Sequence, residues 1–523
     1  MSIGKHATRW ATLLLLLAPV AAPAVSQEEA NDQQEKAEKK ENGKKKEPQD
    51  ETSVTKHRVS VGGQEIAYTA TAGTLVMKKE DGSPLASIFY IAYTRDGVRD
   101  PATRPITFSF NGGPGSSSVW LHLGVLGPRR VDMPDEPQIP RPPYRLVDNA
   151  ESILDVTDLV FIDPVTTGYS RAVPPEKDDP FHGFEQDIES VGDFIRLHLT
   201  RSERWASPKF LIGESYGTTR AAGLSGYLQD RHGIYLNGVM LVSSILNFQT
   251  ARFEVGNDLP HVLFLPTYTA TAWYHRRLPA DLQSLPLRQV LDAAEAFASG
   301  DYSLALARQA EMPEAEVRAV AQDLARFTGL SLDYVLRSNL RVPASRFFKE
   351  LQRDAVLTTG RLDSRYTGVD RDAAGERNEF DPSYAAIQGP YTATLNDYVR
   401  RTLGFKSDLP YEILTGRVGP WSYEEYQNRY LNVAETLRQA MAKNPWLQVY
   451  VANGYYDLAT PYYATEYTFD TLQLAPSLAD NVTMGYFEAG HMMYIHGPSR
   501  RAMKEDLTEF IQTASGAGSS PEP

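Results

Sequence analysis

A serine with the surroundings of an activated nucleophile lies near the middle of the chain. Ser215 is the central residue of Gly-Glu-Ser-Tyr-Gly at positions 213–217. An apolar run at 209–212 precedes this motif and a helix-like run to Leu228 follows it, so G-x-S-x-G stands between a strand and a helix. Such a turn exposes the serine Oγ above the end of a sheet. The pattern therefore predicts Ser215 as a nucleophile.

A nucleophilic serine needs a general base, and the base needs an acid that orients it. On scaffolds with this turn, the acid and then the histidine follow the serine along the chain. The apolar run at 447–451 leads into Asp457, and the run at 482–487 leads into His491. Both residues follow the carboxyl end of a predicted strand, where open α/β sheets place their sites. We predict a catalytic triad of Ser215, Asp457 and His491.

A glycine-rich turn supplies the expected anion-stabilising backbone. The sequence Asn-Gly-Gly-Pro-Gly-Ser-Ser-Ser at 111–118 follows an apolar run at 105–110. A turn after this early strand provides one backbone donor of an oxyanion hole, and the amide of the residue after the nucleophile, Tyr216, provides the other. N–H groups held by Gly and Pro reorganise little when negative charge develops.

Together these blocks resemble the serine carboxypeptidase family, peptidase family S10. The likeness rests on the motifs at 111–115, 161–170 and 213–217, on Asp457, and on Gly-His-Met at 490–492. It covers residues 100–250 and 430 to the end. The resemblance implies an α/β-hydrolase core that removes single amino acids from peptide C-termini.

The resemblance also implies roles for residues around Ser215. Glu214 is expected to bind the terminal carboxylate of the substrate. Because two close carboxylates repel, one of them must be protonated, and we expect activity to be best at acidic pH. The implied oxyanion amides are those of Gly113 and Tyr216, and the implied substrate-binding residues are Asn111, Gly112, Glu214 and Met492, the last in the pocket for the leaving residue.

One departure from the family keeps an alternative open. The chain has Val125-Leu126-Gly127-Pro128 where the family usually has Glu-Leu-Gly-Pro. The missing glutamate normally hydrogen-bonds the partner of Glu214, so Val125 favours an esterase or acyltransferase that uses the same triad. A non-catalytic binding protein on this fold is a further alternative, against which the intact Ser, Asp and His argue.

The elements that must position these residues follow an α/β pattern. Six short apolar runs, continuous rather than alternating, predict a mostly parallel sheet covered on both faces by helices. Helical patterns at 287–297 and 313–327 dominate the middle of the chain, and a further helix is expected over 426–441. The predicted order is a hydrolase core at 58–250, a mainly helical inserted cap domain at 251–420, and the rest of the core at 421–513.

The two ends of the chain carry their own signals. Lys5 and Arg9 precede an apolar stretch at 11–25, which is shorter than the ~20 residues of a membrane span and predicts a signal peptide over 1–26. A charged, disordered tether is expected at 27–57 and a disordered tail at 514–523. We therefore expect an exported protein of bacterial secreted type, periplasmic or secreted, with no stable membrane insertion after cleavage.

Composition excludes several classes of function. The 523 residues carry a net charge of −13, which argues against nucleic acid as a partner. The chain has no cysteine, so disulfides, thiolate catalysis and Cys-ligated zinc are excluded. We expect no metal and no cofactor, and the expected partners are peptides with a free C-terminal carboxylate.

Overall fold

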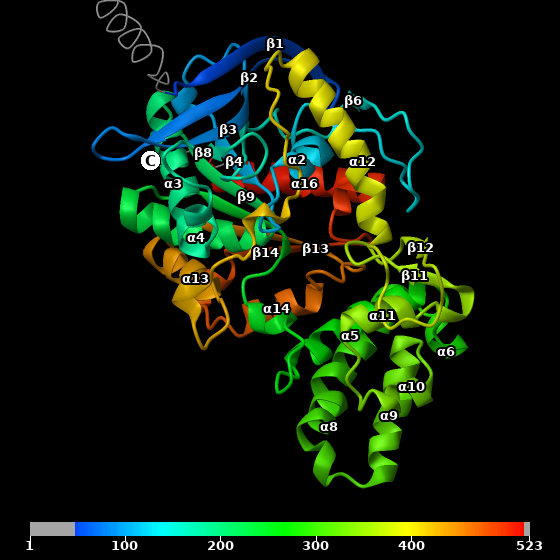
Figure 1. The fold of residues 1–523 in the computed structure, drawn as a ribbon. Helices are drawn as coiled ribbons and strands as arrows, with labels where there is room; N and C mark the ends of the chain where they lie inside the picture. The colour runs from blue at the N-terminus through cyan, green and yellow to red at the C-terminus, as the bar shows by residue number, and fades with distance from the viewer. Residues whose placement is uncertain (1–47, 517–523) are drawn as a thin grey trace, which may run out of the picture. The chain divides into compact units, whose positions relative to one another are not determined.

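A ten-stranded sheet is the central element of residues 48–516, the part of the chain that the computed structural model describes (Figure 1). The strands pair in the order β1-β2-β3-β7-β4-β9-β10-β13-β14, and β8 pairs with β3. Their bounds are β1 (Glu51–Val61), β2 (Gln64–Lys78), β3 (Pro84–Arg95), β4 (Ile106–Phe110), β7 (Asp158–Ile162), β8 (Arg171–Ala172), β9 (Lys209–Ser215), β10 (Gly238–Ser244), β13 (Gln448–Gly454) and β14 (Val482–Phe487).

The six apolar runs of the sequence form the parallel part of this sheet. Strands β7, β4, β9, β10, β13 and β14 pair in parallel, and most of their side chains are buried. Both faces are covered by helices, which is why these strands read as continuous apolar runs. The prediction of a mostly parallel sheet between helices is confirmed.

The antiparallel strands β1, β2 and β3 were not predicted. β1 alternates exposed and half-buried residues over most of its length, so it lacks the continuous apolar run of a doubly covered strand. β1 also includes residues 51–57, which were expected to belong to the tether. The folded core therefore begins at Glu51 rather than at residue 58, while the expected signal peptide and most of the tether lie outside the described residues.

Adjacent residues of the central strands point to opposite layers of helices. Ile212 joins one apolar cluster with Met503 of α16, and Leu211 joins the other with Val191 of α3 and Leu224 of α4. Strand geometry requires this alternation. The helices of the core are α2 (Val119–Leu121), α3 (Phe184–Arg201), α4 (Tyr216–His232), α13 (Ala434–Lys443), α14 (Tyr462–Asp470), α15 (Pro476–Ala479) and α16 (Gly497–Ala514).

The expected cap at 251–420 consists of two parts with different cores. The first is a helical body with its own apolar cluster, in which Phe264, Tyr268 and Phe347 are buried together; Figure 1 shows its helices in green and yellow-green. It contains α5 (Leu259–Tyr274), α6 (Ala280–Gln283), α7 (Leu287–Phe297), α8 (Ser303–Arg308), α9 (Glu314–Thr328), α10 (Leu332–Arg337) and α11 (Ala344–Glu350), followed by the hairpin β11 (Leu357–Thr359) and β12 (Thr367–Val369).

The second part of the insertion packs on the sheet. α12 (Pro382–Asp397) places Ile387, Tyr391 and Leu395 in the same cluster as α16. It also contacts α2 and β5 (Arg129–Val131), which pairs with β6 (Leu146–Asp148). The insertion is thus a helical body plus a segment that belongs to the core layer.

The helix expected over 426–441 is shorter at its start. α13 begins at Ala434, whereas Tyr426 lies in a short 3₁₀ turn and its ring packs edge-on against Phe184. The apolar spacing at 426–433 therefore reflects loop packing and not a helical face. The helix ends at Lys443, just before Asn444-Pro445, as the sequence indicates.

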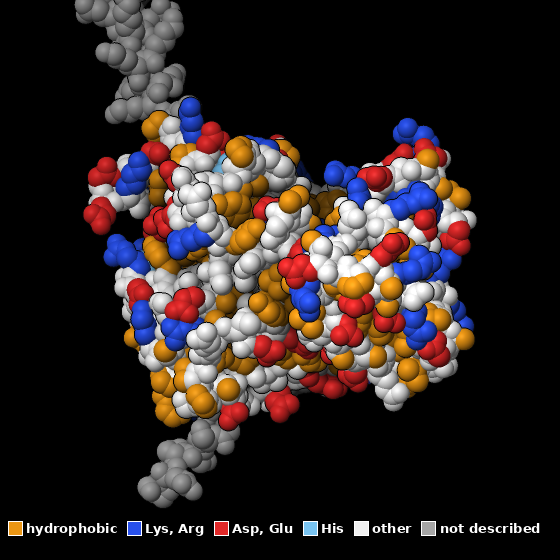
Figure 2. All heavy atoms as spheres, turned by 90° about the horizontal axis from the view of Figure 1, so that it is seen from below, with side chains coloured by type: hydrophobic (Ala, Val, Ile, Leu, Met, Phe, Trp, Pro, Cys, Tyr) orange, Lys and Arg blue, Asp and Glu red, His pale blue; other side chains and the backbone are white. Residues whose placement is uncertain are grey.

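Figure 2 shows Asp and Glu side chains interspersed with Lys and Arg over the face that it presents. Each helix within residues 48–516 is too short or too polar to cross a bilayer. Across the same residues, no group of three or more His, Asp or Glu side chains is arranged to hold a metal ion.

Candidate active site

Ser215 lies at the junction of β9 and α4 in a strained backbone conformation. Its φ of 60° and ψ of −129° depart from those of an ordinary L-residue. The two glycines of the motif are required by close packing. A Cβ on Gly213 would lie 2.1 Å from the carbonyl oxygen of Gly217, and one on Gly217 would lie 2.8 Å from that of Phe110 on β4. This packing is the strand–turn–helix arrangement that G-x-S-x-G predicts.

Asp457 and His491 form a buried hydrogen-bonded pair at the ends of β13 and β14. His491 Nδ1 lies 2.7 Å from Asp457 Oδ2, and both side chains are almost fully buried. Asp457 also accepts from the amides of Ala459 and Thr460 and from the Thr460 hydroxyl at 2.7 Å. These donors fix the carboxylate, which in turn fixes the tautomer of His491 with its proton on Nδ1.

The electrostatics of this pair favour the charged imidazole. Burial disfavours the imidazolium, but the charge of Asp457 and its hydrogen bond outweigh burial, so the pKa of His491 is raised above its usual value. Such a histidine is a stronger base and holds a positive charge that develops during a reaction.

A turn segment of the insertion between β11 and β12, residues 361–365, holds the loops that carry Asp457 and His491. The amide of His491 donates to Leu362 O at 2.6 Å, and that of Leu458 donates to Arg361 O at 3.1 Å. The carboxylate of Asp363 binds the Arg365 guanidinium at 2.6 Å and accepts from Gly490 N at 3.2 Å. The insertion therefore contributes directly to the position of the two residues.

The glycine-rich turn after β4 lies against the backbone that follows Ser215. A Cβ on Gly112 would lie 2.4 Å from the amide nitrogen of Tyr216. The end of the turn is held by Asp163, whose carboxylate accepts from Ser118 N at 2.9 Å and from Tyr411 Oη at 2.7 Å. This packing brings the turn that carries Gly113 close to the Tyr216 amide.

Glu214 is buried and both of its carboxyl oxygens have partners. Asn111 Nδ2 donates to Oε1 at 3.1 Å, and the Tyr494 hydroxyl donates to Oε2. Burial raises the pKa of Glu214 to about 7 and the nearby charge of Asp457 adds to the increase, while His491 and the two donors oppose it. A neutral Glu214 is therefore well populated at acidic pH.

Tyr494 packs beside the segment that contains Val125 and donates to Glu214. Val125 is fully buried among apolar side chains. The ring of Tyr494 fits beside the neighbouring Gly124, where a Cβ would lie 2.2 Å from the ring. A tyrosine that follows His491 in the chain thus supplies a donor to Glu214.

A cleft of about 350 Å³ gathers most of the predicted site residues. Its lining includes Ser215, His491, Glu214 and Met492, together with Gly112 and Gly113. Asn111 and Asp457 are fully buried behind it, each bonded to a lining side chain. Tyr216 lines a neighbouring cleft that shares Ser215, Gly113 and Pro114 with the first.

The sequence reasoning missed four residues that support this site: Tyr494, Thr460, Asp163 and Arg361. Thr460 and Tyr494 stand three residues after Asp457 and His491, and Asp163 follows β7, so strand-end position was a usable signal for them. Arg361, which lines both clefts, has no such signal because it comes from the insertion.

Comparisons with known proteins agree with this arrangement. Residues 63–272 match the family model of serine carboxypeptidases. This match includes Ser215 and the turn at 111–118 and ends before Asp457 and His491. The chain is 25% identical to serine carboxypeptidase-like 36 of Arabidopsis thaliana over 190 residues. This matched stretch covers 35% of this chain and 36% of the relative. The matched stretch thus spans about a third of that protein.

A solved structure shows the fold over a larger part of the chain. The prohormone-processing carboxypeptidase Kex1(delta)p of Saccharomyces cerevisiae superposes with a TM-score of 0.54, covering 86% of this chain and 91% of that chain at 17% sequence identity. The predicted α/β-hydrolase fold is confirmed by this likeness.

Proposed function

We propose that this protein is a serine carboxypeptidase that removes C-terminal amino acids from peptides through an acyl-enzyme. The observation that carries the proposal is one cleft lined by Ser215, by His491 bonded to Asp457, and by the buried acid Glu214. The family match over residues 63–272 and the serine carboxypeptidase-like relative support it.

The chemistry assigned to the triad is acyl transfer in two steps. Ser215 Oγ attacks the scissile carbonyl while His491 Nε2 accepts the hydroxyl proton, and Asp457 stabilises the imidazolium. His491 then gives this proton to the amine of the departing residue as the C–N bond breaks. Water, deprotonated by His491, attacks the acyl-enzyme and releases the shortened peptide and Ser215.

We assign to the backbone around Ser215 the role of stabilising the negative charge of each tetrahedral intermediate. The amides of Gly113 and Tyr216 are the proposed donors, and the close approach of Gly112 to the Tyr216 amide supports their pairing. Because the turn at 111–118 is held by hydrogen bonds to Asp163, little reorganisation is needed when the charge forms.

Glu214 is the proposed recognition group for the substrate's terminal carboxylate. In its neutral form it can donate a hydrogen bond to that carboxylate, whereas its ionised form repels it. A pKa of about 7 makes the neutral form the major one below that pH. The expected pH dependence is therefore a loss of activity on free acids as the pH rises through 7.

An esterase or acyltransferase is the second candidate. Both oxygens of Glu214 are engaged by Asn111 and Tyr494, which favours a Glu214 that supports the turn without contacting substrate. Such an enzyme uses the same triad and is indifferent to a terminal carboxylate. For either activity, the basic and apolar start of the sequence supports export of the protein from the cell.

The decisive experiment compares an N-blocked dipeptide with its C-terminal amide. The carboxypeptidase proposal expects hydrolysis of the free acid and at most slow hydrolysis of the amide, with Ser215→Ala inactive but folded. Equal rates on the two compounds support the esterase instead. Failure of a fluorophosphonate to label the native protein at Ser215 contradicts both and revives the non-catalytic binding protein.

A further inference from the structure

A second cleft meets the first at Ser215 and has a different chemical character. It has a volume of about 580 Å³ and its lining includes Ser215, Tyr216 and Gly113 from the core. The opposite wall comes from the helical body, with Phe264 of α5 and Phe348 of α11. Under the proposed function the leaving residue occupies the Glu214 side, so the acyl part of the peptide lies in this second cleft.

Apolar side chains form part of the lining of this cleft. Phe264, Phe348 and Leu458 are buried, and Phe248 and Tyr423 pack against each other with ring centroids 6.0 Å apart. A surface of this kind accepts a large apolar side chain, because it removes apolar area from water.

Three arginines also line this cleft: Arg252, Arg361 and Arg377. All three are exposed, and the lining contains no Asp or Glu among the described residues. The guanidinium of Arg252 lies 5.7 Å from the centroid of the Phe248 ring, at the edge of the apolar surface. None of the three makes an ion pair within residues 48–516. Other arginines of the helical body do form ion pairs: Arg277 with Asp354, Arg326 with Asp281, and Arg341 with Asp258.

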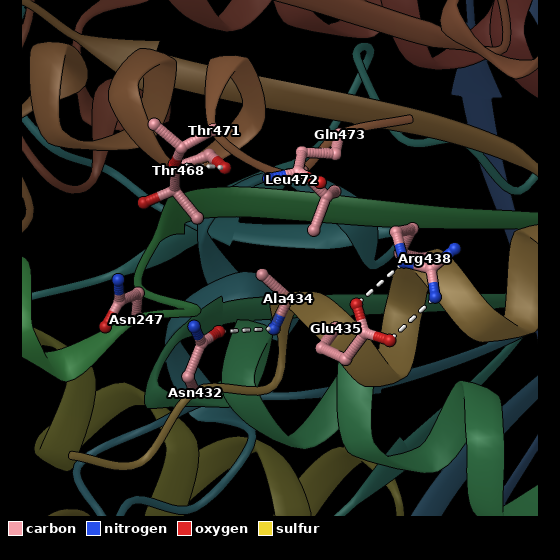
Figure 3. Close-up of a pocket in the computed structure, with 9 residues that line it drawn as sticks. All are labelled: Asn247, Asn432, Ala434, Glu435, Arg438, Thr468, Thr471, Leu472 and Gln473. Carbon is pink, nitrogen blue, oxygen red and sulfur yellow. Dashed lines mark hydrogen bonds and ion pairs between the residues drawn. The ribbon is translucent and has the colours of Figure 1, made fainter. Parts of the chain in front are cut away.

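A polar hollow elsewhere on the core provides a contrast. It has a volume of about 440 Å³ and lies between α13, α14 and Asn247 (Figure 3). Its two charged lining residues neutralise each other, since Arg438 Nε and Nη2 each lie 2.7 Å from an oxygen of Glu435. No unpaired charge remains there to select a ligand, unlike in the cleft beside Ser215.

We infer that the second cleft selects peptides with an apolar penultimate residue and an acidic residue immediately before it. Three exposed guanidiniums without an ion pair within residues 48–516, in a chain with a net charge of −13, create a local positive field that attracts carboxylates. The inference rests on the proposed function, because the direction of the peptide follows from binding of its terminal carboxylate near Glu214.

The test measures release of leucine from N-acetyl-Glu-Phe-Leu, N-acetyl-Gln-Phe-Leu and N-acetyl-Lys-Phe-Leu. We expect kcat/KM to fall in the order Glu, Gln, Lys, with the Glu peptide preferred over the Gln peptide by about threefold or more. Raising the salt from about 20 mM to about 500 mM should reduce this ratio, because exposed charges are screened.

Variants test whether the three arginines cause the preference for the Glu peptide. Replacing all three, as R252Q/R361Q/R377Q, should bring the ratio of the Glu to the Gln peptide close to one. Arg318→Gln, which changes an exposed arginine of α9 outside the cleft, is the matched control and should keep the native ratio. A native ratio of one, or a ratio that the triple variant retains, overturns the inference.

A second measurement separates this inference from the proposed function. Protection of Ser215 from a fluorophosphonate by N-acetyl-Glu-Phe, compared with N-acetyl-Gln-Phe, reports the same selectivity without turnover. Selective protection without leucine release supports the acidic-ligand site and contradicts the carboxypeptidase. Leucine release without any selectivity in either assay supports the carboxypeptidase and contradicts the acidic-ligand site.

Discussion

The core side and the insertion side of Ser215 differ in how their polar groups are held. On the core side, Asp457 has four hydrogen-bond donors and Glu214 has two, and all of these groups are buried. On the insertion side, Arg252 and Arg377 are exposed and make no ion pair within residues 48–516. The buried groups on the core side are held in place by their hydrogen bonds, whereas the exposed groups on the insertion side remain available for a ligand.

The segment at 361–365 connects the two sides. Asp363 and Arg365 are buried together and bond to the loop before His491, although both come from the insertion. The insertion therefore helps to hold the loop that carries His491, the proposed base.

Asp457→Asn should reduce kcat by about 10⁴-fold, because an amide cannot hold His491 in the required tautomer. Thr460→Val removes one of the four donors and should reduce kcat by only about tenfold. Steady-state kinetics on a blocked dipeptide check both variants, with circular dichroism to confirm folding. If Asp457→Asn costs no more than Thr460→Val, then Asp457 is not the orienting acid.

Asp363→Ala should lower the free energy of unfolding by about 3 kcal/mol, because it leaves the buried Arg365 without its carboxylate. The control is Asp333→Ala, which breaks the exposed Asp333–Arg337 pair on α10 and should cost about 0.5 kcal/mol or less. Urea denaturation measures both. Equal losses would show that the insertion does not anchor the His491 loop.

Under the proposed function, Tyr494→Phe should change the pH profile of kcat/KM. The hydroxyl of Tyr494 stabilises the charged form of Glu214, so its removal raises the pKa of Glu214 further above its value of about 7. For a free-acid substrate, the fall of kcat/KM at high pH should therefore move upward by about one pH unit. The profile for an ester should not move, because the ester has no terminal carboxylate.

The matched control for this change is Tyr302→Phe. Tyr302 is a fully buried tyrosine of the helical body that donates to Leu340 O at 2.7 Å. Its loss should affect stability and leave both pH profiles in place. A Tyr494→Phe profile identical to the native one for the free acid contradicts a substrate-binding Glu214.

Much of the core could be predicted because its signals are local. The parallel strands are continuous apolar runs, and Ser215, Asp457 and His491 each stand within six residues of the end of such a run. β1 was missed because one face of this edge strand is exposed, and an alternation of exposed and half-buried residues is a weaker signal than a continuous apolar run. The prediction of a helix over 426–433 was wrong because Tyr426 packs against Phe184, an apolar partner that is distant in the sequence.

The sequence by itself determined which residue types stand at the strand ends, and hence the chemistry that the core can perform. Only the tertiary structure decided that Tyr494 donates to Glu214, that Asp363 supports the His491 loop, and that Arg252 shares a cleft with Ser215. These contacts join residues from different elements, and they form only when the insertion and the core pack together. Strand-end motifs are set by neighbours along the chain, but partners and pockets depend on packing between distant segments.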